Sequence, residues 1–146
     1  MKTVLTAIGC SLLLSGCLPI PHVNQIAPEV TGVVLRNGQP APGVVIYWHT
    51  RYAPTETACA ASPVSVTTDA QGRFQLEGER ELFLFSAMGD PLMSWTICLQ
   101  DAGTMYTGWR SFHLGYAEKQ VHMVCDLATP LRPEQKDRGL CDIDRL

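Results

Sequence analysis

The cysteines are the residues whose chemistry their spacing constrains most, because a thiol can form a disulfide, bind a metal or carry a covalent modification. No CxxC or HxxxH spacing occurs in the sequence. A structural metal site is therefore not predicted, and we expect no cofactor. The 146-residue chain contains six cysteines: Cys10, Cys17, Cys59, Cys98, Cys125 and Cys141.

The first sixteen residues have the pattern of an export signal. Lys2 supplies a positive charge, and the apolar run that follows it to Leu14 is too short to span a bilayer comfortably. The small residues Ser15 and Gly16 then precede Cys17. We expect residues 1–16 to be removed on export.

The four residues Leu14-Ser15-Gly16-Cys17 resemble the lipobox of bacterial lipoproteins. The resemblance implies cleavage before Cys17, a diacylglycerol thioether on its sulfur and a fatty acyl chain, such as palmitate, on its amine. Leu18 stands where inner-membrane lipoproteins of enteric bacteria carry Asp, which implies an anchor in the outer membrane that faces the periplasm. The alternative is an ordinary signal peptide with a chance cysteine.

The composition limits the other ways in which the exported chain can meet a membrane or a partner. Cleavage leaves 130 residues, enough for one domain, and removes only Lys2 of the 11 basic and 14 acidic residues, so the net charge becomes −4. This charge argues against nucleic acid as a partner and against electrostatic membrane binding. No later segment approaches the roughly 20 apolar residues of a membrane helix. Membrane attachment is therefore expected through lipid alone.

Short β-branched or alternating stretches dominate the exported chain and predict an all-β fold, a single antiparallel β-sandwich of about seven strands. Segment 17–28 is expected to be the lipidated tether, 29–127 the sandwich and 128–146 a C-terminal tail. Asn37-Gly38 predicts a tight turn, and 134–140 one helical turn. A long loop is expected over 51–63. The expected strands lie at 29–36, 43–50, 65–68, 73–76, 81–87, 94–100, 104–110 and 120–127.

Four cysteines remain after export, and an even number in an oxidising compartment predicts two disulfides with three possible pairings. Strand alternation places Cys98 on the polar face of its strand and Cys125 on the apolar face of its own. Because paired side chains must point the same way, we prefer Cys59–Cys98 and Cys125–Cys141. The first pair would hold the long loop against a sheet, and the second would hold the tail.

The segment 30–74 resembles the start of a carboxypeptidase-regulatory-like, or transthyretin-like (prealbumin), domain. The resemblance implies the first strands of a β-sandwich, and nothing after Phe74 matches that family. The matching residues are Val30-Thr31-Gly32-Val33-Val34, Gly38-Gln39-Pro40, Pro42-Gly43-Val44 and Thr68-Asp69-Ala70-Gln71-Gly72-Arg73-Phe74.

Two enzyme types built on related sandwiches are not supported by these residues. Hydroxyisourate hydrolases end in Tyr-Arg-Gly-Ser, whereas this chain ends in Cys141-Asp142-Ile143-Asp144-Arg145-Leu146. Intradiol dioxygenases hold iron with two tyrosines and two histidines, and no His-x-His occurs here among Tyr47, Tyr106, Tyr116, His113 and His122. A Ser/His/Asp hydrolase stays open on composition, although no Gly-x-Ser-x-Gly turn is present. We expect a protein that is not an enzyme and has no catalytic residues.

Aromatic residues beside arginines are the remaining feature, and both are enriched in protein interfaces. The alternative is that these side chains pack locally. We expect a non-catalytic binding or structural module with a protein partner in the envelope. The alternatives are a periplasmic immunity or inhibitor lipoprotein that neutralises a toxin or enzyme, and a hydrolase or metal enzyme. The candidate partner surface comprises Arg51, Tyr52, Trp109, Arg110, Phe112 and Tyr116.

Overall fold

The computed structural model describes residues 21–50, 59, 62, 64–83, 92–128 and 138–145. The all-β prediction is confirmed, and the described residues contain eleven strands in place of about seven. None of them belongs to a helix long and apolar enough to cross a bilayer. The strands are β1 (His22–Ala27), β2 (Glu29–Arg36), β3 (Gln39–Pro40), β4 (Val45–His49), β5 (Val64–Thr67), β6 (Arg73–Leu76), β7 (Glu79–Phe83), β8 (Leu92–Asp101), β9 (Thr104–Leu114), β10 (Gln120–Asp126) and β11 (Cys141–Arg145).

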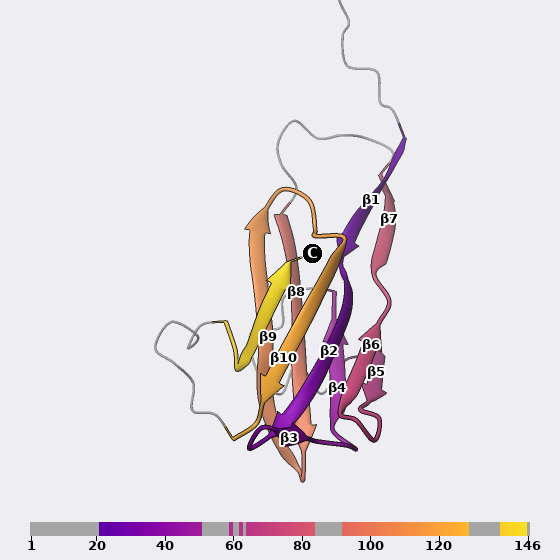
Figure 1. Ribbon diagram of the computed structural model, residues 1–146. Helices are drawn as coiled ribbons and strands as arrows, with labels where there is room; N and C mark the ends of the chain where they lie inside the picture. Colours follow the sequence, from indigo (N-terminus) through magenta and orange to yellow (C-terminus); the bar gives the residue numbers. More distant parts are fainter. Residues whose placement is uncertain are drawn as a thin grey trace, which may run out of the picture.

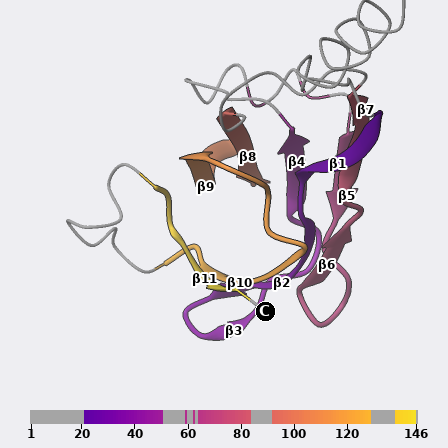
Figure 2. The same cartoon turned by 90° about the horizontal axis from the view of Figure 1, so that it is seen from above.

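The strands form three sheets (Figure 1). β1 and β7 pair as a two-stranded ribbon. A five-stranded sheet has the order β11–β10–β2–β3, with β6 also paired to β2, and a four-stranded sheet has the order β5–β4–β8–β9. Figure 2 shows the two larger sheets as facing layers, with β2 and β10 opposite β4 and β8. The architecture is therefore sandwich-like.

The core lies between the two larger sheets because alternate side chains of each strand point toward the other layer. The predicted alternation of β8 and β10 is confirmed: Trp95, Ile97 and Leu99 are buried, as are Val121 and Met123. The aromatic rings of Trp48 and Trp95 lie 5.5 Å apart between centres. The core also includes Val30, Val34, Ile46, Phe74, Leu76, Trp109, Cys125 and Cys141.

One pairing departs from the predicted antiparallel arrangement. β2 and β10 run parallel, with Val30 opposite Val121 and Val34 opposite Cys125. Between β2 and β10 the chain forms the strands of the opposite sheet. It then returns to the five-stranded sheet, where β10 lies beside β2. This crossover lets β10 enter in the same direction as β2, which two strands joined by a tight hairpin cannot do.

Three further segments differ from the predictions. Residues 22–27, expected to be part of an unstructured tether, form β1, because β7 supplies hydrogen-bonding partners for it. β9 continues to Leu114, beyond the predicted end at residue 110. The tail contains β11, which pairs with the edge of β10. Residues 134–137, most of the predicted helical turn, lie outside the described residues.

The structure pairs Cys59 with Cys98 and Cys125 with Cys141, which confirms the preferred pairing. Cys98 lies on the face of β8 that points away from the core, where Tyr47 and Met105 pack against the disulfide. Cys125 and Cys141 are opposite each other across β10 and β11, with Cα atoms 4.1 Å apart. One disulfide therefore fixes Cys59 to the outside of the four-stranded sheet, and the other fixes β11 to β10.

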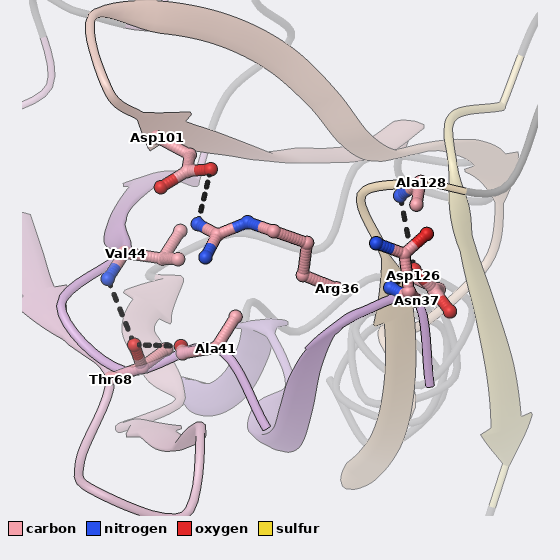
Figure 3. A network of polar contacts seen from close by, with 8 residues as sticks. All are labelled: Arg36, Asn37, Ala41, Val44, Thr68, Asp101, Asp126 and Ala128. Atoms are coloured by element: carbon pink, nitrogen blue, oxygen red, sulfur yellow. Dashed lines mark hydrogen bonds and ion pairs between the residues drawn. The ribbon is translucent and has the colours of Figure 1, made fainter. Parts of the chain in front are cut away.

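Polar side chains connect the turns at one end of the sandwich (Figure 3). Arg36 on β2 makes an ion pair of 2.5 Å with Asp101 on β8. The Asp126 carboxylate accepts hydrogen bonds from the backbone N–H groups of Ala128, Gly38 and Asn37 at 3.0, 2.9 and 3.1 Å. These hydrogen bonds lower the pKa of Asp126 from its ordinary value of 3.8, and the one from Ala128 has the largest effect.

A buried hydroxyl joins two further turns at this end. Thr68 Oγ1 accepts a hydrogen bond of 2.9 Å from the Val44 N–H and donates one of 2.8 Å to the Ala41 carbonyl (Figure 3). Thr68, Val44 and Ala41 are all buried. The side chain thus provides partners for two backbone groups that water does not reach.

Candidate functional site

The most exposed apolar side chains of the four-stranded sheet lie where β8 begins and β9 ends. Leu92, Phe112 and Leu114 are 57%, 63% and 70% exposed. Leu92 is directly opposite Leu114 in the register, and Phe112 is opposite Ser94, one pair away on the same face. We call these three residues the β8–β9 patch. Adjacent exposed apolar side chains of this kind mark interaction sites on soluble domains.

A bulge in β9 decides which aromatic residues reach this face. The register shifts between Ile97 and Cys98, so that Ile97 faces Trp109 while Cys98 faces Thr107, and Gly108 is the additional residue. A Cβ atom at Gly108 would lie 2.4 Å from Leu99 Cδ1, which is why the close approach requires glycine. The bulge directs Trp109 into the core and places Phe112 on the outer face.

The residues of the predicted partner surface differ in exposure. The prediction of an exposed Trp109 is wrong, because this side chain is buried in the core. The Arg138 guanidinium carbon lies 5.9 Å from the centre of the Trp109 ring. Phe112 and Tyr116 are exposed, as a partner surface requires. Arg51 and Tyr52 lie outside the described residues, as does Cys17, so the structure says nothing of them.

Arg110 follows Trp109 and lies between the patch and the bulge. It faces outward opposite Thr96, and its Nη2 donates a hydrogen bond of 3.1 Å to Thr107 Oγ1. Its Nε is buried and has no acceptor in the part of the chain that the structure describes. A partner cannot reach this buried Nε, so what Arg110 offers a binding surface is its outward position beside the exposed Phe112.

Leu92 and Leu114 were missed by the sequence analysis because both lie outside the predicted strand limits, 94–100 and 104–110. A signal was present in the sequence. Ser111, Phe112, His113 and Leu114 alternate between polar and apolar residues within the stretch interpreted as a polar connection.

A cleft of about 790 Å³ opens between β4 and β5 on one side and β6 and β7 on the other. Its lining combines apolar Trp48, Val66 and Leu76 with the carboxylates of Glu77 and Glu79. A mostly apolar concavity with a few polar groups is the general form of a small-ligand site. No group of three or more His, Cys, Asp or Glu residues that could hold a metal occurs among the described residues.

A second hollow, of about 590 Å³, lies on the outer face of the five-stranded sheet. There Thr31 Oγ1 and His122 Nδ1 are 3.1 Å apart, a hydroxyl within hydrogen-bonding distance of a base. Nucleophilic catalysis also needs a group that orients the base. Among the side chains that the structure describes, no carboxylate contacts His122, so the pair alone does not define a catalytic site.

The comparisons with known proteins give a family and a distant likeness to solved structures. The family described as Domain of unknown function (DUF6795) matches residues 30–130. No curated protein matches the chain. The dioxygenase domain of a dioxygenase carbohydrate-binding protein fusion from the cellulolytic bacterium Streptomyces sp. SirexAA-E is 19% identical, with a TM-score of 0.39, over 80% of this chain and 86% of that chain. A likeness of this degree carries no argument about activity.

Proposed function

The chain belongs to the DUF6795 family, whose function is unknown, and from that premise we propose that it is a lipid-anchored protein of the bacterial envelope that binds a protein partner without catalysis. The anchor is Cys17, held in the outer membrane on the periplasmic side. The domain is a sandwich of the transthyretin-like kind, and its β8–β9 patch receives the partner.

The observation that carries this proposal is the exposure of the β8–β9 patch. Leu92, Phe112 and Leu114 are more than half exposed on neighbouring positions of one sheet face. Burying apolar surface contributes roughly 25 cal/mol per Å², and aromatic and arginine side chains carry much of the affinity of protein interfaces. Phe112 with Arg110 beside it provides both kinds of anchor.

The two disulfides support the exported location. Cys59–Cys98 and Cys125–Cys141 are each internal to the domain and buried. Disulfides persist in oxidising compartments such as the bacterial periplasm and are rare in the cytosol. A protein with two buried disulfides fits the periplasm.

The test is affinity capture of the full-length chain, expressed with its signal in its native host and crosslinked in the intact envelope. The variant Phe112→Ser/Leu114→Ser removes two of the three apolar side chains of the patch, and Val124→Ser changes an exposed residue of the other sheet as a matched control. We expect one specific partner with the wild type and with Val124→Ser, and at least about tenfold less with the patch variant.

Equal capture by the patch variant and the control would refute the patch as the docking surface. The identity of the partner specifies the role. A toxin or an enzyme indicates an inhibitor, and a resident envelope protein indicates a structural module. Mass spectrometry of the same material tests the anchor independently, since acylated Cys17 is expected to carry the mass of its lipid chains.

A further inference from the structure

The β1–β7 ribbon exposes an apolar pair that the sandwich does not use. Val23 and Leu82 are opposite each other in the register and therefore share one face of the ribbon. They are 62% and 58% exposed. Gln25 and Arg80 form the next pair on that face, while the rings of His22 and Phe83 stack on the other at 5.9 Å.

The position of the ribbon points to what covers this pair. Figure 1 shows β1 and β7 rising beyond the ends of the other strands, with the start of β1 at the tip. His22, the first residue of β1, follows Cys17 by five residues. Five residues span at most about 17 Å. A Cys17 whose acyl chains lie in a bilayer therefore holds Val23 and Leu82 close to the lipid surface.

We propose that the tip of the β1–β7 ribbon contacts the bilayer, with Val23 and Leu82 in the lipid headgroup region. The inference rests on the proposed function, since it takes Cys17 to be acylated. The headgroup region of one leaflet is about 5 to 7 Å thick, which is deep enough for one cross-strand pair of side chains.

The position near Cys17 is what favours lipid, and two properties of the ribbon indicate the kind of contact it makes. An isolated two-stranded ribbon is only marginally stable in water, so burial of an apolar face adds order where few other contacts exist. In β7 the two negative charges of Glu79 and Glu81 outnumber the positive charge of Arg80. Electrostatic attraction therefore does not explain a contact of the ribbon with an anionic membrane. The contact is thus apolar, and we expect it to be insensitive to salt.

The contact orients the domain as well as holding it. A lipid anchor joined by a flexible segment leaves a domain free to rotate, whereas a second contact at the ribbon fixes which end faces the membrane. β1 continues into β2, a central strand of the five-stranded sheet. The orientation imposed at the ribbon is therefore transmitted directly to the sandwich.

The experiment uses the full-length chain expressed with its signal, purified from membranes and reconstituted into phosphatidylethanolamine/phosphatidylglycerol vesicles that contain lipid with brominated acyl chains. Leu82→Trp places an indole in the proposed contact. Glu81→Trp places one at the same height on the opposite face, and Val124→Trp places one on the five-stranded sheet. The native Trp48, Trp95 and Trp109 are buried and give a common background.

We expect bromine quenching of Leu82→Trp to exceed that of both other variants at least about twofold, with a blue-shifted emission that survives about 0.5 M salt. Equal quenching at residues 81 and 82, or none at 82, would overturn the proposal. Crosslinking between the ribbons of two molecules would show that Val23 and Leu82 contact a second copy of the chain, which also overturns the proposal.

The design separates this inference from the proposed function. Mass spectrometry of the reconstituted protein first shows whether Cys17 is acylated, so a missing anchor is recognised as a failure of the proposed function. A fourth variant, Phe112→Trp, tests the β8–β9 patch. The start of β8 and the end of β9 lie toward the same end of the molecule as the β1–β7 ribbon (Figure 1). Strong quenching there would assign the patch to lipid and refute the protein-docking role without affecting the comparison of residues 81 and 82.

Discussion

Replacement of Thr68 by valine tests whether the hydroxyl that joins two turns is a main source of stability at that end of the sandwich. Valine keeps the branched shape and removes the oxygen. The Val44 N–H loses its 2.9 Å partner, and the Ala41 carbonyl loses a 2.8 Å donor. Both backbone groups belong to fully buried residues, so water does not replace the hydroxyl.

The magnitude follows from the cost of burying unsatisfied polar groups. Each orphaned donor or acceptor costs about 1 to 3 kcal/mol, so the loss of both partners in Thr68→Val is expected to lower the free energy of unfolding by about 2 to 6 kcal/mol. Thr68→Ser is the matched control. It retains both hydrogen bonds and loses one methyl group, which costs about 1 kcal/mol.

The assay is equilibrium urea unfolding of the exported, disulfide-bonded protein, followed by tryptophan fluorescence. With an m-value of about 2 kcal/mol/M, the valine variant unfolds about 1 to 3 M earlier than the wild type and the serine variant about 0.5 M earlier. An unchanged m-value shows that the native fold is retained. A valine variant at least as stable as the serine variant would falsify the assignment of stability to these two hydrogen bonds.

Three further predictions concern the turns and the tail. Cys125→Ala/Cys141→Ala is expected to lower the free energy of unfolding by at least about 3 kcal/mol, the chain-entropy value for a sequence separation of 16, in a urea titration; a loss below about 1 kcal/mol contradicts it. Gly139→Ala places a Cβ 2.2 Å from the Gly108 carbonyl oxygen, whereas Gly38→Ala meets nothing within 4 Å, so thermal unfolding should show a loss for Gly139→Ala that is larger by about 1 to 3 kcal/mol. Because the pKa of Asp126 is lowered from 3.8, its contribution is present above that pH and is lost as the pH falls through the lower folded value. The wild-type urea midpoint should therefore fall more between about pH 6 and about pH 2.5 than that of Asp126→Asn, and equal slopes would exclude the effect.

The sequence predicts well the features that depend on local patterns. Alternation of side chains identifies the inward faces of β8 and β10. It also predicts the disulfide pairing, because Cys98 points away from the core and Cys125 points into it, so these two cysteines do not pair. Asn37-Gly38 predicts a tight turn, and both residues adopt positive φ angles of 54° and 73°. These properties require no knowledge of which strands become neighbours.

The features that the sequence does not predict depend on distant partners. β1 exists because β7 lies beside it, and β11 because the edge of β10 is open to it. No local pattern in the sequence of β2 or β10 indicates that these two strands pair in parallel. Trp109 was misassigned because the bulge at Gly108 changes the side to which every later residue of β9 points, and only the register reveals it.

The pairing of β2 with β10 sets the order in which the chain completes its fold. Thr31 and His122 are neighbours although 91 positions separate them in sequence. In the export that we propose, the chain emerges amino end first, and most of its length must appear before β2 has its parallel neighbour. Contacts of such long range slow folding and prolong the exposure of unpaired strand edges. The nascent protein is thus expected to depend on periplasmic chaperones and on thiol oxidation that follows the arrival of the last cysteine.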